Sequence, residues 1–479
     1  MKIFRFFLIC ATIVTLNSCN YSQNDKSDAN KTQRVEKNEY EFVIEPQFDI
    51  AYPFYDGDLA EIVINGINGK CGFINKTGKI VIIPQFDYIS HFASGIAAVR
   101  VGEKWGYIDT AGEIVIKPQF DYAYPFYESY GGLAEVKIGG KRGYIDTNGN
   151  FVIGPYDYIG SFSKELMAVR IVGKWGYVDK TGKIVIKLQF EDARGFSEGI
   201  AAVKVGEKWG YIDTTGNIVI KPQFDDAESF IEGLAAVKVG RKWGYINTTG
   251  NFAINPQFEI VHCFSEGIAR VQVKNLWGKK WGCIDKNGVF VVKPKFSSID
   301  PFNGEGRALV VVKKLWGKKY GYIDKTGEYV VKPKFDGISS FYEGLAKVRI
   351  GDKWGYMNKA GEVVIKPQFD YVHDFSEGMA AVRMGTKWGY IDKTGKVIIE
   401  PQFVIESEDE DEPPFDEEFY RFCFSEGLAA VKVGKKWGYI DRTGKFVIEP
   451  QFDYVDGFIG GLAAVKVGEK WGYIRYTGK

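Results

Sequence analysis

The sequence predicts an all-β repeat protein built from about twelve tandem three-stranded antiparallel β-meander units of about 34 residues each. Three observations lead to this prediction. The pair Trp-Gly, or a substituted copy of it, recurs at a nearly fixed spacing along most of the 479 residues. Short apolar runs and turn motifs flank each copy. The 57 Gly, 35 Phe, 28 Tyr and 11 Trp residues suit strands joined by tight turns better than helices.

The tryptophans of the repeat are interpreted as packing residues. A residue that recurs in every unit is most simply explained by what every unit must do, which is to fold and to stack on its neighbours. The glycine that follows allows a ring or a neighbouring strand to approach closely. Three further copies keep the frame with Cys71, Arg142 or Tyr320 before the glycine. The tryptophan copies are Trp105, Trp175, Trp209, Trp243, Trp281, Trp354, Trp388, Trp437 and Trp471.

Each element of a unit can be justified along one clean copy, Gly233 to Glu259. "LAAVKV" is a first strand that ends at a Gly-x-Lys turn, and "KWGYI" is the second strand. An Asp/Asn-x-x-Gly turn follows, in which the first side chain accepts backbone N–H bonds and the glycine supplies the left-handed conformation. A third apolar run ends at proline, which cannot donate to a continuing ladder. The turn aspartates Asp109, Asp213, Asp392 and Asp441 are interpreted as turn caps.

Both faces of these strands carry apolar side chains, so we expect neighbouring units to cover each small sheet on both sides. The pattern begins with a lone third strand, Glu41 to Asp49, and finishes with a first and a second strand. Joined together, the two fragments make one unit, as in the closure of a β-propeller. Twelve three-stranded blades lie outside the usual range of propellers. We therefore expect an open superhelical array, with a closed β-propeller-like ring completed by the N-terminal strand as the alternative.

Residues 1–18 are predicted to be a lipoprotein signal peptide, because a basic start precedes an apolar run and the sequence Leu16-Asn17-Ser18-Cys19. An ordinary cleaved signal and an uncleaved anchor are the alternatives. Residues 19–38 then form a lipidated Cys19 and a polar, disordered tether. The lipid would hold the array, residues 39–479, at a membrane. The remaining cysteines, whose disulfide state is left open, are Cys71, Cys263, Cys283 and Cys423.

The recurring segment resembles the bacterial WG-repeat family. Lys387 to Phe403 reads "KWGYIDKTGKVIIEPQF", and Lys208 to Phe224 and Lys436 to Phe452 are close to it. The resemblance covers essentially all of the chain after the tether. It implies a repeat scaffold, often exported or associated with the envelope, and it brings no catalytic residues.

Two adjacent units depart from the pattern in the hairpin between their first and second strands. Val273 to Lys280 and Val312 to Lys319 each hold four extra residues, Leu-Trp-Gly-Lys, where other units have only a short turn. These two longer hairpins carry Trp277, Lys279, Trp316 and Lys318. They could present aromatic faces to a sugar ring, or an apolar anchor flanked by lysines to a protein. The alternative is that the tryptophans fold back over their own hairpins.

The second departure is an acidic insertion, residues 404–422, with nine carboxylates between Glu406 and Glu418 and the pair Pro413-Pro414. A solvated, mobile loop is the first interpretation, a basic protein partner the second, and cation binding the third. No Asp-x-Asp-x-Asp-Gly calcium loop is present in it.

Composition and motifs argue against several classes of function. The net charge of +1 offers no case for nucleic-acid binding. His91, His262 and His373 are scattered, and His373-Asp374 is interpreted as a surface pair. We therefore expect no enzyme and no cofactor or metal. The leading hypothesis is a non-catalytic cell-envelope lipoprotein whose array binds a protein partner. The alternative is a carbohydrate- or peptidoglycan-binding module that uses exposed aromatic residues.

Overall fold

A computed structural model describes residues 39–54, 57–64, 69–127, 131–160, 166–276, 278–314, 317–404 and 422–478. The chain divides into two units, Met1–Asn38 and Glu39–Lys479. The predicted signal peptide, Cys19 and tether all lie outside the described residues, so they stay predictions. The second unit holds the whole repeat array.

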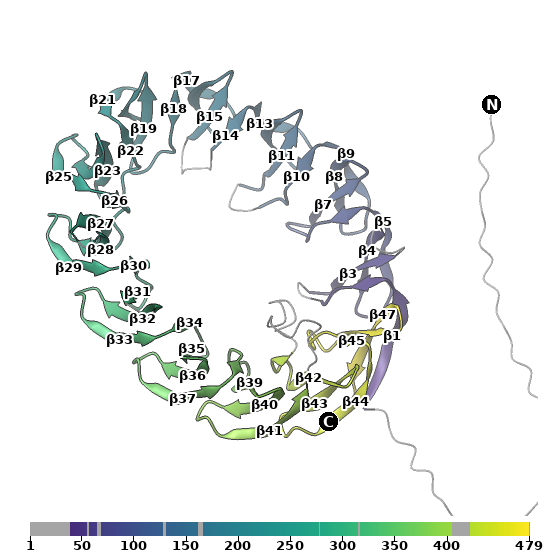
Figure 1. The fold of residues 1–479 in the computed structure, drawn as a ribbon. Helices are drawn as coiled ribbons and strands as arrows, with labels where there is room; N and C mark the ends of the chain where they lie inside the picture. The colour runs from purple at the N-terminus through teal and green to yellow at the C-terminus, as the bar shows by residue number, and fades with distance from the viewer. Residues whose placement is uncertain are drawn as a thin grey trace, which may run out of the picture. The chain divides into compact units, whose positions relative to one another are not determined.

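Twelve small sheets follow one another around a ring, in a β-propeller-like arrangement (Figure 1). We call each sheet a blade: blade 1 holds β2 to β5, blade 7 holds β26 to β29, and blade 8 holds β30 to β33. Blade 10 holds β38 to β41, blade 11 holds β42 to β44, and blade 12 holds β45 to β47 with β1. The first strand of a blade lies toward the centre of the ring and the third strand at its circumference.

The three long strands of each blade form an antiparallel meander. The first strands are β3 (Leu59–Ile64), β7 (Ile96–Val101), β11 (Ala134–Ile138), β15 (Met167–Ile171), β19 (Ile200–Val205), β23 (Leu234–Val239), β27 (Ala269–Asn275), β31 (Arg307–Lys314), β35 (Leu345–Ile350), β39 (Met379–Met384), β42 (Leu428–Val433) and β46 (Ala463–Val467). The second strands, which carry the Trp-Gly pair or its substitute, are β4 (Lys70–Asn75), β8 (Lys104–Asp109), β12 (Lys141–Ile145), β16 (Lys174–Val178), β20 (Lys208–Asp213), β24 (Lys242–Asn247), β28 (Gly278–Ile284), β32 (Gly317–Asp324), β36 (Lys353–Asn358), β40 (Lys387–Asp392), β43 (Lys436–Asp441) and β47 (Lys470–Tyr476). The third strands are β5 (Ile80–Phe86), β9 (Ile114–Phe120), β13 (Phe151–Tyr156), β17 (Ile184–Phe190), β21 (Ile218–Phe224), β25 (Phe252–Phe258), β29 (Phe290–Phe296), β33 (Tyr329–Phe335), β37 (Val363–Phe369), β41 (Val397–Val404), β44 (Phe446–Phe452) and β1 (Tyr40–Phe48).

The blades also contain a fourth, inner strand that the sequence did not predict. After most third strands the chain crosses to the next blade and pairs briefly with its first strand, so that, in the described ranges, eleven sheets have four strands and one has three. Ten inner strands are two residues long, and β34 (Gly337–Tyr342) is longer. The short ones are β2 (Ile50–Ala51), β6 (Tyr88–Ile89), β10 (Tyr122–Ala123), β14 (Tyr158–Ile159), β18 (Asp192–Ala193), β22 (Asp226–Ala227), β26 (Ile260–Val261), β30 (Ser298–Ile299), β38 (Tyr371–Val372) and β45 (Tyr454–Val455).

The ring is closed by the two ends of the repeat array. β1 pairs with β47 in antiparallel register, with Tyr40 opposite Tyr476 and Phe42 opposite Ile474. The first third strand of the chain thereby completes the last blade. The expected all-β repeat is confirmed, and so is the alternative of a closed ring; the expected open superhelical array is wrong. Closure leaves the array without a free terminal edge, which a solenoid would have to cap.

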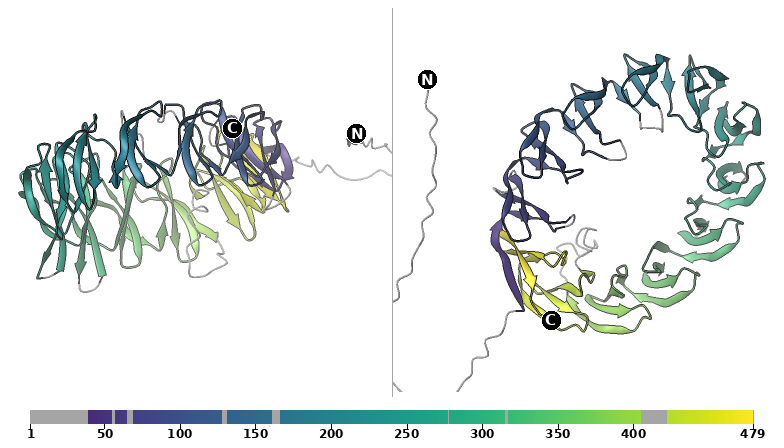
Figure 2. Two further views of the ribbon diagram at one scale, coloured as in Figure 1. Left: turned by 90° about the horizontal axis from the view of Figure 1, so that it is seen from above. Right: turned by 180° about the vertical axis from the view of Figure 1, so that it is seen from behind.

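The two faces of the ring differ in the turns that they carry. Turns between first and second strands lie on one face, here called the hairpin face. The Asp/Asn-x-x-Gly turns between second and third strands lie on the other, the turn face, and the antiparallel strands run between the two (Figure 2). A third strand therefore ends at the hairpin face, as the pairing of Lys387 with Val404 shows.

The glycine of each Trp-Gly pair faces a kink in the third strand. In blade 6 Trp243 is opposite Phe258 and Tyr245 is opposite Ile254, so one residue on β24 faces three on β25. The kinked backbone passes so close that a Cβ on Gly244 would lie 2.5 Å from the backbone oxygen of Ile254. The corresponding glycine of every blade faces a similar obstruction. Trp-Gly and Pro-Gln-Phe are thus two halves of one β-bulge.

We expect Gly244→Ala to lower the free energy of unfolding by about 2–3 kcal/mol, because the new methyl group meets backbone that cannot move without breaking the bulge. Denaturant titration followed by tryptophan fluorescence measures the change. Gly304→Ala is the matched control, since a Cβ there meets no heavy atom within 4 Å. Equal effects of the two substitutions would contradict the close approach as the reason for the glycine.

Candidate functional site

In most blades the tyrosine of the second strand joins the blade to the next one. Tyr211 lies at 0% exposure, and its hydroxyl donates to the carbonyl oxygen of Glu228 on the following blade at 2.8 Å. Burial raises the pKa of this phenol, so the hydroxyl stays a donor. The ring closes with the same bond, from Tyr473 to the carbonyl of Tyr52 at 2.7 Å. Equivalent donors are Tyr107, Tyr177, Tyr245, Tyr356, Tyr390 and Tyr439.

The tryptophans pack in the junctions between blades. Trp105 lies between Tyr88 of its own blade and Tyr122 of the next, with ring centroids 5.3 and 5.0 Å away. A cation from the first strand commonly lies over the ring, as Arg170 of β15 does at 5.8 Å from the centroid of Trp175. The tryptophans that the structure buries are Trp105, Trp175, Trp209, Trp388 and Trp437, and those that it leaves partly exposed are Trp243, Trp281, Trp354 and Trp471.

A carboxylate on the hairpin face clamps neighbouring blades together. Asp225 accepts from Lys208 Nζ of the preceding blade and from the backbone N–H of Gly240 of the next, at 2.6 Å each. The lysine holds the pKa of Asp225 below its usual range. The closing junction pairs Lys470 with Asp49 at 2.5 Å. Further complete clamps are centred on Asp87, Asp121, Glu191, Asp336, Asp370 and Asp453.

A second carboxylate joins blades on the turn face. Glu232 has a left-handed backbone with φ 55°, which is unfavourable for a residue with a side chain. Its carboxylate accepts from the backbone N–H of Gly267 at 2.9 Å and pairs with Lys286 at 3.2 Å, both on the next blade. Glutamate therefore occupies a position that suits glycine or asparagine because its side chain reaches the next blade. The turn aspartates act within one blade, as Asp213 accepts from the N–H groups of Thr215 and Asn217 at 2.9 Å.

Blades 7 and 8 carry the longer hairpins that the sequence indicated. In blade 7 the ladder continues outward to Lys274–Lys279 and Asn275–Gly278, and in blade 8 to Lys313–Lys318 and Lys314–Gly317. Lys279 and Lys318 are exposed, and so is Leu276, at 99%. Trp277 and Trp316 lie outside the described residues, so their packing or exposure stays a prediction.

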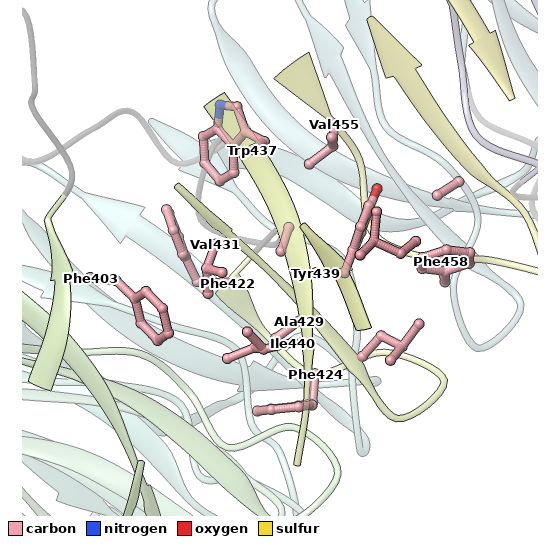
Figure 3. Close-up of a cluster of buried hydrophobic side chains, with 14 of the residues drawn as sticks. Phe403, Phe422, Phe424, Ala429, Val431, Trp437, Tyr439, Ile440, Val455 and Phe458 are labelled. Carbon is pink, nitrogen blue, oxygen red and sulfur yellow. The ribbon is translucent and has the colours of Figure 1, made fainter. Parts of the chain in front are cut away.

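The acidic insertion ends in a buried aromatic residue. Residues 405–421 lie outside the described part, but Phe422 is 3% exposed, and its ring centroid lies 5.8 Å from that of Trp388 and 5.5 Å from that of Trp437. Figure 3 shows Phe422 and Trp437 in this buried cluster. Its carbonyl accepts from Tyr390 at 3.0 Å. Among the described residues, blade 11 has no inner strand of the kind that places Tyr371 and Tyr454 next to tryptophans in blades 10 and 12. Phe422 thus continues the aromatic row across the insertion.

His373 lies inside this row rather than on the surface. It is 5% exposed and stacks on Trp388 at 5.0 Å and on Phe422 at 6.1 Å. The predicted surface pair His373-Asp374 is therefore wrong, because the neighbouring blade covers the imidazole. Burial, with a smaller effect of the Lys347 charge, lowers the pKa of His373 to about 3.

Stability should consequently fall as the pH is lowered. The unfolded chain takes up a proton at this histidine near pH 6.5, whereas the folded chain does so only near pH 3. This difference removes about 1.4 kcal/mol per pH unit below pH 6.5. We expect His373→Phe to show a shallower decrease in unfolding free energy between pH 7 and pH 5, measured by denaturant titration. The exposed His91 supplies the control variant His91→Phe, and identical pH profiles of all three proteins would refute the assignment.

A group of partly exposed tyrosines lies on and next to the inner strands of blades 1 to 4. Their exposed fractions lie between 42 and 47%. Tyr122 contacts Tyr124 at 4.8 Å, and Tyr158 contacts Trp175 at 5.0 Å. A cavity of about 760 Å³ adjoins Tyr158 and is lined by Arg170, Asp192 and Arg194. The group, which we call the tyrosine arc, comprises Tyr52, Tyr88, Tyr122, Tyr124 and Tyr158.

Other chemistry is sparse in the part of the chain that the structure describes. The four cysteines Cys71, Cys263, Cys283 and Cys423 are free thiols. Burial raises the pKa of the Cys71 and Cys283 thiols to about 12. Within the described ranges, histidines, cysteines and carboxylates form no group of three that could hold a metal ion. Those ranges also contain no helix long and apolar enough to cross a membrane.

Comparisons with known proteins bear on the repeat. A family model described as "WG containing repeat" matches residues 41–66, 72–105, 105–141, 143–175, 175–209, 209–243, 243–277, 281–316, 320–354, 354–388, 388–404, 417–437 and 437–471. A comparison with curated proteins finds no match.

Solved structures resemble the chain only distantly. A eukaryotic initiation factor is 11% identical over 68% of this chain and 92% of its own, with a TM-score of 0.36. The extracellular domain of the putative hybrid two component system BT3049 from B. thetaiotaomicron is 11% identical over 91% and 69%, with a TM-score of 0.23. Kluyveromyces lactis Hsv2 is 10% identical over 55% and 95%, with a TM-score of 0.28. None of these scores is high enough to bear on function.

Proposed function

This chain belongs to the family of WG containing repeat proteins, and on that premise we propose that its ring is a non-catalytic scaffold that binds another protein through the longer hairpins of blades 7 and 8. A lipid at Cys19 would hold the scaffold at a bacterial cell envelope. The junction bonds occupy the residues that recur from blade to blade, which leaves the departures from the repeat to carry recognition.

The observation that carries this proposal is the shape of two adjacent hairpins. They extend the ladder by two residue pairs beyond the length of an ordinary hairpin such as β23–β24, which ends at Val239–Lys242. Leu276 is fully exposed at the end of one of them. Leu276 is an exposed apolar side chain on a projecting hairpin that also carries Lys274 and Lys279, and such a side chain suits the centre of a protein interface.

Shortening both hairpins should abolish partner binding without unfolding the ring. In the variant, residues 274–279 and 313–318 are each replaced by Gly-Glu, the turn that follows Val205 in blade 5. We expect a cross-linkable residue placed at Gly278 to capture an envelope protein in the full chain. The same residue placed at the glycine of the new blade 7 turn in the shortened variant should recover none. The same cross-linkable residue placed at Gly206, on an ordinary hairpin, is the control.

The melting temperature must also stay within a few degrees of the native value, because other blades use the short turn. Recovery of the same protein by the shortened variant would contradict the proposed interface.

A second candidate function, glycan binding, is favoured by the tyrosine arc. Its rings are partly exposed, Tyr122 contacts Tyr124, and the cavity next to Tyr158 offers Arg170 and Asp192 as polar partners for hydroxyl groups. Aromatic faces beside hydrogen-bonding groups suit sugar rings. This second function would place the glycan-binding site at the inner strands instead of at the two hairpin tryptophans.

The two candidate functions predict different responses of the protein to soluble sugar. If the tyrosine arc binds glycan, peptidoglycan-derived oligosaccharides should change the fluorescence of Trp105, which lies 5.0 Å from Tyr122. Tyr88→Ala with Tyr122→Ala should then weaken binding about tenfold. Tyr342→Ala, an exposed tyrosine outside the arc, is the control. Unchanged fluorescence at millimolar sugar in the native protein would exclude the glycan candidate.

A further inference from the structure

The junction between blades 1 and 2 departs from the repeat at three neighbouring positions. Blade 2 holds β6 to β9, and blade 3 holds β10 to β13. In blade 1, Cys71 stands in place of the tryptophan of the second strand and Phe73 in place of the tyrosine. Glu61 lies opposite Phe73 on the first strand, at the position where most blades have alanine. These alanines are Ala98, Ala168, Ala202, Ala236, Ala381, Ala430 and Ala464.

These substitutions accompany a cavity of about 390 Å³ at the same junction. Aromatic rings of its lining come from Tyr52 and Phe73 of blade 1 and from His91 and Phe92 of blade 2. The ring centroids of Phe73 and Phe92 lie 5.5 Å apart. Phe73 has no hydroxyl to donate to the carbonyl of Ser90, which follows the inner strand as the acceptors of other junctions do. The junction therefore has a cavity with aromatic walls where others have a tyrosine hydrogen bond.

Glu61 brings a carboxylate to the lining of this cavity. The carboxylate accepts from the thiol of Cys71, and burial raises the pKa of that thiol to about 12, so the thiol stays a donor. Burial also raises the pKa of Glu61, because the charged form loses water. Asp58, the other carboxylate of the lining, pairs with Lys76 at 3.4 Å. Among the described residues, no lysine or arginine lines the cavity, and none forms an ion pair with Glu61.

Blade 3 contains the same carboxylate together with a counter-ion. Glu135 occupies the position of Glu61, and Arg142 occupies the position of Cys71, in the same register of the ladder. The two side chains of blade 3 pair at 3.2 Å. Arginine in place of the tryptophan thus supplies a guanidinium group to the glutamate, whereas cysteine supplies a short side chain and leaves space. A guanidinium group from outside the ring would complete in blade 1 the pair that blade 3 makes by itself.

We propose that the cavity between blades 1 and 2 binds the guanidinium group of a ligand, with Glu61 as its counter-ion. A carboxylate accepts two parallel N–H bonds from this planar group. The aromatic walls favour a weakly hydrated planar cation over a compact ammonium ion. The group belongs to a small molecule or to an arginine side chain of a peptide, and the chemistry of recognition is the same for both. The inference goes beyond the proposed function, because it involves neither the hairpins of blades 7 and 8 nor a glycan.

Calorimetric titration of the full chain tests the site with butylguanidinium and with butylurea, a neutral compound of similar shape. We expect butylguanidinium to bind at least about tenfold more tightly, because only the cation pairs with the carboxylate. Glu61→Gln keeps the shape of the side chain and should weaken butylguanidinium binding about tenfold or more. Glu135→Gln is the matched control and should leave the affinity unchanged, since Arg142 already pairs with that carboxylate. A blocked Gly-Arg-Gly peptide that binds more tightly than butylguanidinium identifies an arginine side chain as the ligand, and weaker binding of the peptide identifies a small molecule.

Cys71→Arg is a second variant that keeps the carboxylate in place. Its new side chain should pair with Glu61 as Arg142 pairs with Glu135, and so abolish butylguanidinium binding while the melting temperature stays at or above the native value. Equal affinities for butylguanidinium and butylurea would overturn the inference, as would the absence of binding of either compound at millimolar concentration. Unchanged butylguanidinium binding by either variant, Glu61→Gln or Cys71→Arg, would overturn it too.

Discussion

The close approach of the second-strand glycine to a kinked third strand is the constraint on which the ring depends. At Gly244 no side chain fits against the backbone oxygen of Ile254, and the kink brings Phe258 opposite Trp243. From that kink the chain leaves its blade and enters the next, where it adds the inner strand. The tyrosine hydrogen bonds and the carboxylate clamps then join one blade to the following one. A change at the glycine therefore disturbs a junction as well as a strand.

The junctions owe their strength to packing and buried hydrogen bonds more than to their ion pairs. Pairs such as Lys208–Asp225 are partly exposed, and exposed pairs contribute about 0–1 kcal/mol each. The tyrosine hydroxyl bonds and the aromatic rows are buried, so their loss leaves unsatisfied groups and voids. Most blades make the same junction, so closure by β1 and β47 adds one more copy of an existing contact, and the bonds Tyr473–Tyr52 and Lys470–Asp49 reproduce it.

The sequence was sufficient for the period, the number of units, the three long strands and the turn caps, because each has a local signal. The inner strands escaped prediction because two residues carry no periodicity. Ring closure could not be predicted because it depends on the rotation between successive blades, summed over the whole array. The unit split between the two ends of the array nevertheless pointed to it. His373 and Phe422 were missed for a related reason. Their burial comes from a neighbouring blade, and only the recurrence of aromatic residues on or next to the inner strands, as at Tyr122, hinted at it.

Departures from the repeat gather on the hairpin face because changes there cost the junctions little. Replacing the clamp carboxylate by Ser297 removes an exposed ion pair but keeps the bond to the next hairpin, so the junction loses little. Lengthening a hairpin adds residue pairs beyond the packed part of the blade, and an insertion after β41 needs only an aromatic residue such as Phe422 to restore the row. The turn face has less freedom, because glutamates such as Glu232 are held in a left-handed conformation by the next blade. Recognition can therefore be built on the hairpin face without altering the junctions that hold the ring together.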